Sequence, residues 1–130
     1  MVAGSGHQPH YIVARHCNAI RIEVDAELAE FRECNCSVCA RSGFLHWYLP
    51  HTSVRLLTQS PCLSTYVWRY LGGSQHFCSA CGTPVLRTGY KDQGVSVNAR
   101  CLEGIDVFEL KTQRFDGRQK LPPGPMAPRI

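Results

Sequence analysis

The chain has 130 residues, of which 44% are hydrophobic and 18% charged, as expected for a single compact domain with one core. This composition excludes intrinsic disorder of the whole chain. Lys and Arg outnumber Asp and Glu by 14 to 10, giving a formal net charge of +4 that is spread along the sequence. Because no basic stripe with interleaved aromatic residues stands out, we expect no nucleic-acid partner.

Short strands dominate the pattern in chain order. The segment from Tyr11 to Val24 has a sequence typical of a strand, in which Ile20, Ile22 and Val24 alternate with charged residues. Gly and Pro turns separate seven further predicted strands: Phe44–Leu49, Val54–Leu57, Leu63–Tyr70, Gln75–Phe77, Val85–Thr88, Val95–Ala99 and Val107–Phe115. This spacing predicts an all-β fold of small packed antiparallel sheets. The one stretch with helical character is Ala26–Glu30, which is too short to be stable alone.

The C-terminal segment is rich in proline. Half of the eight prolines fall in Leu121–Ile130, where they cannot donate backbone hydrogen bonds to a sheet. We therefore expect a domain over residues 11–117 followed by a proline-rich surface tail over residues 118–130.

Eight cysteines are the most informative feature of the composition. The first twenty residues contain no recognisable secretory signal, and nothing approaches a membrane span of about 20 apolar residues. We therefore expect a cytoplasmic protein without a membrane partner, whose thiols stay reduced. Clustered cysteines in that setting indicate metal ligands or catalytic thiols more often than disulfides.

The densest cluster is the run Cys34-Asn35-Cys36-Ser37-Val38-Cys39. On an extended segment Cys34 and Cys36 project to the same side, and a turn after them would bring Cys39 round to face both. Three thiolates would then occupy three corners of a tetrahedron. Structural zinc sites have four protein ligands, whereas three ligands and an open corner are typical of catalytic zinc.

A second motif, Cys78-Ser79-Ala80-Cys81-Gly82, has the spacing of a zinc half-site, with Gly82 able to adopt the positive φ of the turn. Two other interpretations remain for the clustered cysteines. They could form disulfides, which the tight C-x-C spacing disfavours, or they could hold purely structural zinc ions. Cys62 and Cys101 stand apart, and we expect both to be small buried hydrophobic residues.

The order of these motifs resembles the glutathione-dependent formaldehyde-activating enzyme (GFA) family, which includes the centromere protein V group. The resemblance spans roughly residues 11–117, and the matching text is Arg15–Val24, Cys34–Gly43, Val54–Tyr66, His76–Val85 and Val95–Gly104. It implies a compact all-β fold of the Mss4-like β-tent kind with two zinc positions. The implied catalytic zinc ligands are Cys34, Cys36 and Cys39, and the implied structural zinc ligands are Cys17, Cys78 and Cys81.

The resemblance also implies an activity. The family's namesake reaction condenses glutathione with formaldehyde to S-hydroxymethylglutathione, so we expect a zinc-dependent carbon–sulfur lyase acting on a small-molecule thiol and a carbonyl compound. The alternative is a non-catalytic, zinc-stabilised protein-interaction module. A zinc that is open to a cleft would favour the enzyme, and a site closed by a fourth protein ligand would favour the module.

The sequence departs from the family pattern at Arg15, which stands where the first C-x-C motif would have its leading cysteine. A guanidinium cannot ligate zinc because it offers no free lone pair. The structural site is thus left with three thiolates. Either His16, His76, His10 or water supplies a fourth ligand, or the site is empty.

Aromatic and basic residues near the central cysteines are candidates for a substrate pocket: Phe44, His46, Trp47, Arg41 and Arg69. His46 is also a candidate acid or base. Short edge strands in a small all-β domain make a homodimer an expected assembly.

Overall fold

The computed structural model describes residues 9–14, 20–57, 63–67, 73–89 and 94–120. The strands are β1 (His10–Ala14), β2 (Arg21–Asp25), β3 (Phe31–Cys34), β4 (Leu45–Pro50), β5 (Val54–Leu56), β6 (Leu63–Val67), β7 (Ser74–Cys78), β8 (Pro84–Thr88), β9 (Gly94–Asn98) and β10 (Thr112–Phe115). The helices are α1 (Ser37–Ser42) and α2 (Gly117–Lys120), and short 3-10 turns span His51–Ser53, Ala99–Cys101 and Val107–Glu109.

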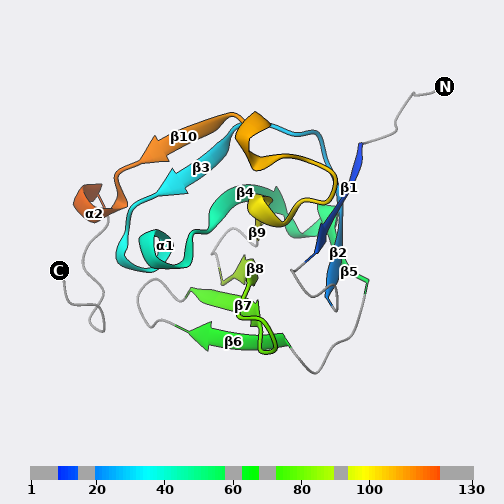
Figure 1. The fold of residues 1–130 in the computed structure, drawn as a ribbon, viewed down its shortest axis with the longest axis horizontal. Coiled ribbons are helices and arrows are strands. Elements are labelled where there is room, and N and C mark those ends of the chain that lie inside the picture. The colour runs from blue at the N-terminus through cyan, green and yellow to red at the C-terminus, as the bar shows by residue number, and fades with distance from the viewer. Residues whose placement is uncertain (1–8, 15–19, 58–62, 68–72, 90–93, 121–130) are drawn as a thin grey trace.

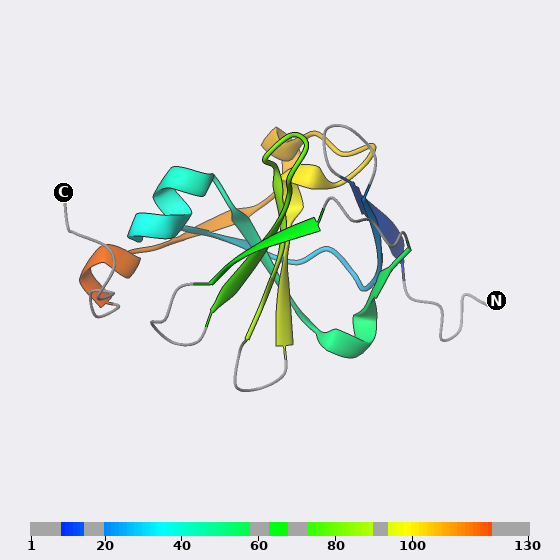
Figure 2. The same cartoon turned by 90° about the horizontal axis from the view of Figure 1, so that it is seen from below.

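The strands form two sheets (Figure 1). The larger sheet has the order β10-β3-β4-β9-β8-β7-β6, and the smaller one has the order β1-β2-β5. All pairs are antiparallel except β10 and β3, which run parallel. Figure 2 shows the second view, with α1 and α2 at one end of the molecule and the small sheet toward the other. The predicted all-β fold is therefore confirmed.

The core lies where the two sheets meet. It contains buried residues from the small sheet, such as Val13 and Val24, together with Phe31, Trp47 and Val97 from the large one. The Trp47 ring packs edge-on against Phe31, with ring centroids 5.6 Å apart. A backbone bridge between Val13 and Leu102 also ties β1 to the segment that follows β9. These contacts fix the strand β3 that leads into the central cysteines.

The prediction of helical character over Ala26–Glu30 was wrong. The backbone amide of Ala26 donates to Pro9 O, and that of Phe31 donates to Lys111 O. Both ends of the stretch are thus tied into an irregular connection between the two sheets. A helix lies instead at Ser37–Ser42, so it begins within the cysteine run and ends after it.

The strand predictions hold with adjusted ends. Strand β3 was not predicted, and Tyr11–Val24 contains two strands where one was expected. Of Val107–Phe115, only Thr112–Phe115 is a strand, because Asp106 caps a 3-10 turn at Val107–Glu109. Helix α2 contains the first residues of the predicted tail, while Leu121–Ile130 lies outside the described residues. Within the described part of the chain, neither helix has the length and apolar character needed to cross a membrane.

Replacing a core ring tests this packing. Phe31 is 1% exposed, so Phe31→Ala is expected to lower the free energy of unfolding by about 3–5 kcal/mol through lost burial and a residual cavity. Phe108 is 91% exposed, so the matched Phe108→Ala change should stay within about 0.5 kcal/mol of the original protein. Urea denaturation followed by tryptophan fluorescence measures both. Equal effects of the two substitutions would contradict the assigned core.

Candidate metal centre

Three cysteine sulfur atoms converge at the junction of β3 and α1. The Sγ atoms of Cys34, Cys36 and Cys39 all lie within 4.8 Å of one another. Tetrahedral zinc with Zn–S bonds of 2.3 Å would hold its sulfur atoms about 3.8 Å apart. The upper limit of 4.8 Å accommodates this spacing, and the soft thiolate donor set suits zinc. These residues form a group that could hold a metal ion.

The local backbone explains the convergence. Cys34 ends β3, and the side chain of Asn35 turns toward the β10–α2 junction, where it donates to Asp116 Oδ1 over 3.1 Å. Cys36 is the N-cap of α1, and its Sγ accepts the backbone N–H of Cys39 over 3.5 Å. The helix then places Cys39 one turn later on the same side. Gly43 ends the helix in the left-handed region at φ 67°.

Backbone N–H groups stabilise negative charge on these sulfur atoms. Besides the bond to Cys36 Sγ, the N–H of Cys36 donates to Cys34 Sγ over 3.4 Å. The hydrogen bonds from Cys34 and Cys39 hold the pKa of the Cys36 thiol far below its ordinary value. Hydrogen bonds with Cys34 and Cys36, together with burial, raise the pKa of Cys39. These contacts therefore favour the anionic form of Cys36 over that of its two neighbours.

A buried arginine contacts the cluster from the sheet. Arg87 of β8 is 3% exposed, and its Nη1 donates to Cys39 Sγ over 2.9 Å. Two hydrogen bonds hold its guanidinium to Gln75 Oε1, at 2.9 and 2.7 Å. It also donates to Ser42 Oγ and lies over the Phe44 ring, 4.4 Å from the centroid. A fixed positive charge thus faces the cysteines.

His46 lies next to this arginine, and its hydrogen bonds define its tautomer. Arg87 Nη1 lies 3.2 Å from His46 Nε2 and can only donate, so Nε2 is the unprotonated nitrogen. Nδ1 therefore carries the proton and donates to Ser96 Oγ over 2.9 Å. Burial, with the nearby charge of Arg87, lowers the pKa of His46 to about 3. His46 is consequently neutral at physiological pH.

The cluster presents three ligand atoms, not four. His46 Nε2 comes within 3.2 Å of Cys39 Sγ, but it does not lie within 4.8 Å of all three sulfur atoms. Its lone pair also faces the Arg87 N–H group. Among the residues the structure describes, no fourth His, Cys, Asp or Glu joins the group. Three protein ligands with one open position are the pattern of a catalytic zinc.

Of the five candidate pocket residues, two lie at the cysteine cluster. Phe44 and His46 lie at the cluster with ring centroids 4.9 Å apart. Trp47 belongs to the core, and Arg41 is exposed and donates to Ser37 O within α1. Arg69 lies outside the described residues.

The second cysteine motif forms a tight turn after β7. Cys78 Sγ accepts the backbone N–H groups of Ala80 and Cys81 over 3.2 and 3.1 Å. Gly82 adopts φ 79° as expected, and Cys81 Sγ lies 3.2 Å from Thr83 Oγ1. The turn thus fixes the position of each cysteine through local hydrogen bonds. No third His, Cys, Asp or Glu ligand atom joins them within 4.8 Å in the part of the chain that the structure describes.

The remaining predicted partners of that motif are elsewhere or undescribed. Cys17, Arg15 and His16 lie outside the described residues, as does Cys62. The ring of His76 lies between Thr65 and Thr88, with a hydroxyl 2.9 or 2.8 Å from each nitrogen. His10 lies in an exposed group with Glu23 and Asp25, which Arg55 also contacts. We find neither histidine directed at Cys78 and Cys81.

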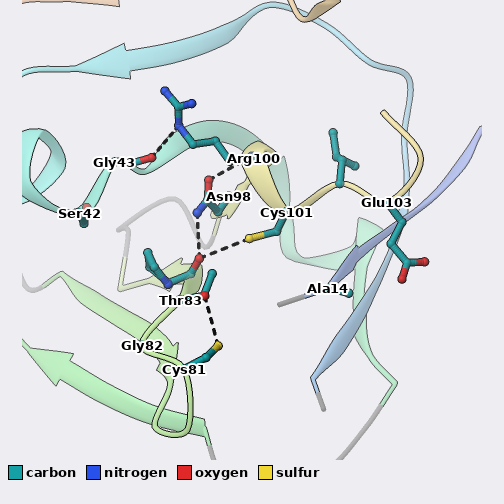
Figure 3. A pocket seen from close by; sticks show the side chains of 12 residues that line it. Ala14, Ser42, Gly43, Cys81, Gly82, Thr83, Asn98, Arg100, Cys101 and Glu103 are labelled. Atoms are coloured by element: carbon teal, nitrogen blue, oxygen red, sulfur yellow. Dashed lines mark hydrogen bonds between the residues drawn. The ribbon is translucent and has the colours of Figure 1, made fainter. Parts of the chain in front are cut away.

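An open pocket of about 640 Å³ lies beside the second motif (Figure 3). It reaches α1 at Ser42 and Gly43 and also contains Cys81 and Cys101. Cys101 Sγ donates to Pro84 O over 3.7 Å, and burial raises the pKa of its thiol to about 11. Cys101 is partly buried and packs against the hydrophobic core, whereas the sequence predicted a small, buried hydrophobic residue.

Sequence reasoning missed Arg87, Gln75 and Ser96. One signal was present, because Arg87 shares its strand face with Val85, which the alternating pattern places in the core. An arginine on a buried face needs polar partners inside the protein. No comparable pattern identifies Gln75 or Ser96.

Both the sequence and the fold of the chain match known proteins. The sequence model of the family described as "Glutathione-dependent formaldehyde-activating enzyme" matches residues 11–116. A crystal structure of a Rhodobacter sphaeroides protein, solved as a structural-genomics target, superposes with a TM-score of 0.66. The two sequences are 26% identical, and the match covers 78% of this chain and 99% of the other.

The His46 tautomer gives a spectroscopic prediction. With a pKa of about 3, the ring should stay neutral and protonated on Nδ1 between about pH 5 and 8. Imidazole ¹H–¹⁵N correlation spectra measure this directly, and the His46→Asn variant identifies the signal by its loss. A His46 resonance that titrates within that range would contradict the buried hydrogen-bond arrangement.

Proposed function

Because the chain belongs to the glutathione-dependent formaldehyde-activating enzyme family, we propose that it is a zinc-dependent carbon–sulfur lyase. Its substrates would be a glutathione-like thiol and a small carbonyl compound such as formaldehyde. The observation that carries the proposal is the cluster of three cysteine sulfur atoms without a fourth protein ligand among the described residues. A catalytic metal needs such an open position for its substrate.

The reaction is an addition that needs no oxidant or reductant. The thiol sulfur bonds to the carbonyl carbon, the C=O π electrons move to oxygen, and the thiol proton ends on that oxygen. The reverse reaction breaks the same C–S bond. When bound at this site, zinc would lower the pKa of a bound thiol or polarise the carbonyl group.

The chain's own residues prepare the site for this chemistry. Cys34, Cys36 and Cys39 would supply three thiolate ligands, and the N-cap position of Cys36 orients its sulfur toward the other two. His46 is held neutral and oriented by Ser96 and Arg87. Cys34 and Cys39 are buried while Cys36 is partly exposed, so solvent and substrate would approach from the Cys36 side.

We also propose that Cys78 and Cys81 are ligands of a second, structural zinc together with Cys17. The N–H bonds to Cys78 Sγ and the Gly82 turn support this. Arg15 leaves this site one cysteine short of a closed shell.

Metal analysis tests the ligand assignment. The purified protein should contain at least one zinc per chain, and Cys36→Ser should lose one equivalent while remaining folded. Cys101→Ser is the matched control, because the Cys101 thiol faces Pro84 O outside the cluster, so this variant should keep the zinc bound at Cys34, Cys36 and Cys39. Inductively coupled plasma mass spectrometry with circular dichroism measures both properties. A stable, folded protein without zinc would contradict the metal proposal.

The reaction itself can be followed by exchange NMR with formaldehyde and glutathione. The protein should accelerate interconversion of free and S-hydroxymethyl glutathione, and Cys36→Ser should return the rate to the uncatalysed background. An unaccelerated rate in the zinc-loaded protein would remove the namesake substrates. Zinc binding without any thiol–carbonyl chemistry would identify the non-catalytic interaction module instead.

A further inference from the structure

We propose that Arg87 is a positioning residue for the metal centre, whose buried positive charge balances the third thiolate of the Cys34, Cys36 and Cys39 site. This inference rests on the zinc site proposed above and concerns how the chain makes that site stable. Arg87 lies on β8, far from the cysteine run in sequence, and its contact with Cys39 Sγ measures 2.9 Å.

The chemistry of the contacts supports a charge role. The groups that hold Arg87 through Gln75, Ser42, His46 and Phe44 are neutral: an amide oxygen, a hydroxyl, an unprotonated ring nitrogen and an aromatic face. Of the five partners named here, only Cys39 can become an anion, as a thiolate ligand of the proposed zinc. A buried charge is costly unless it is paired and hydrogen-bonded. In the zinc-loaded site, the guanidinium and the Cys39 thiolate would therefore stabilise each other.

The charge count of the loaded site leads to the same conclusion. Three thiolates around a divalent ion leave one net negative charge, and Cys34 and Cys39 are 8% and 4% exposed. One guanidinium brings the buried assembly to neutrality. Groups that hydrogen-bond to metal ligands commonly change metal affinity by about 10- to 100-fold. We therefore expect the charge of Arg87 to set the zinc affinity of the site.

The sheet holds the guanidinium in a defined orientation. Gln75 and Arg87 are direct cross-strand partners on β7 and β8, and Gln75 Oε1 accepts from both Nε and Nη2. These two hydrogen bonds fix the guanidinium so that Nη1 is directed at Cys39 and His46. It also explains why the polar Gln75 is buried at 8% exposure.

Zinc affinity in the full-length protein tests the proposal, measured by competition with a chromophoric chelator. Arg87→Met removes the charge at similar length and should weaken binding at the three-cysteine site by about 10- to 100-fold. Arg87→Lys keeps the charge and should restore part of the affinity. Arg21→Met makes the same change in the small sheet, where the arginine contacts Glu103, and should leave affinity unaltered.

A nearly isosteric variant separates charge from packing. Gln75→Glu keeps the size of the side chain but places a carboxylate against the guanidinium, so Arg87 no longer balances the thiolate. It should bind zinc about tenfold more weakly while remaining folded. This variant and Arg87→Lys decide the question even if Arg87→Met fails to fold.

The outcomes distinguish the two proposals. Weaker binding in Arg87→Met and Gln75→Glu, with partial recovery in Arg87→Lys, supports the charge role. Wild-type affinity in Gln75→Glu, and in Arg87→Met where that variant folds, overturns it and leaves the zinc site standing. If the original protein binds no zinc that depends on Cys36, the proposed function fails, and the role of Arg87 fails with it.

Discussion

Three cysteine sulfur atoms lie within 4.8 Å of one another, in a place largely closed to water. The protein must therefore stabilise the negative charge that they carry as metal ligands. Backbone N–H groups supply part of this stabilisation through the N-cap geometry of α1. The guanidinium of Arg87 supplies a fixed positive charge from strand β8. The packing around the site follows from this requirement, because a buried cation needs hydrogen-bond acceptors of its own.

The buried polar residues of the described chain reflect the same constraint. They are His46, Gln75, Arg87, Ser96 and Asn98. They come from the neighbouring strands β4, β9, β8 and β7, and strand register pairs them across the sheet: His46 with Asn98, Arg87 with Ser96, and Gln75 with Arg87. Hydrogen bonds join His46, Ser96, Arg87 and Gln75 into one polar network, and Asn98 bonds to backbone groups beside it. Such networks orient side chains when each member is satisfied.

Much of this architecture could be predicted from local patterns. Alternation and turn residues located most strands because both signals act over a few neighbouring residues. The cysteine spacing predicted that Cys34, Cys36 and Cys39 converge, although a helix at Ser37–Ser42 accomplishes this where a simple turn was expected. The contacts of Arg87 and the strand β3 depend on residues distant in sequence, and local patterns do not report them. The ligands of the second site and the role of Cys17 stay predictions.

Anomalous diffraction at the zinc edge tests the central claim most directly, because it locates the metal without assuming its ligands. We predict a zinc peak within bonding distance of the Cys34, Cys36 and Cys39 sulfur atoms, with a fourth ligand that is not a protein side chain. Arg87 should remain in contact with Cys39. A peak found only at Cys78 and Cys81, or a central zinc closed by a fourth protein ligand, would contradict the account.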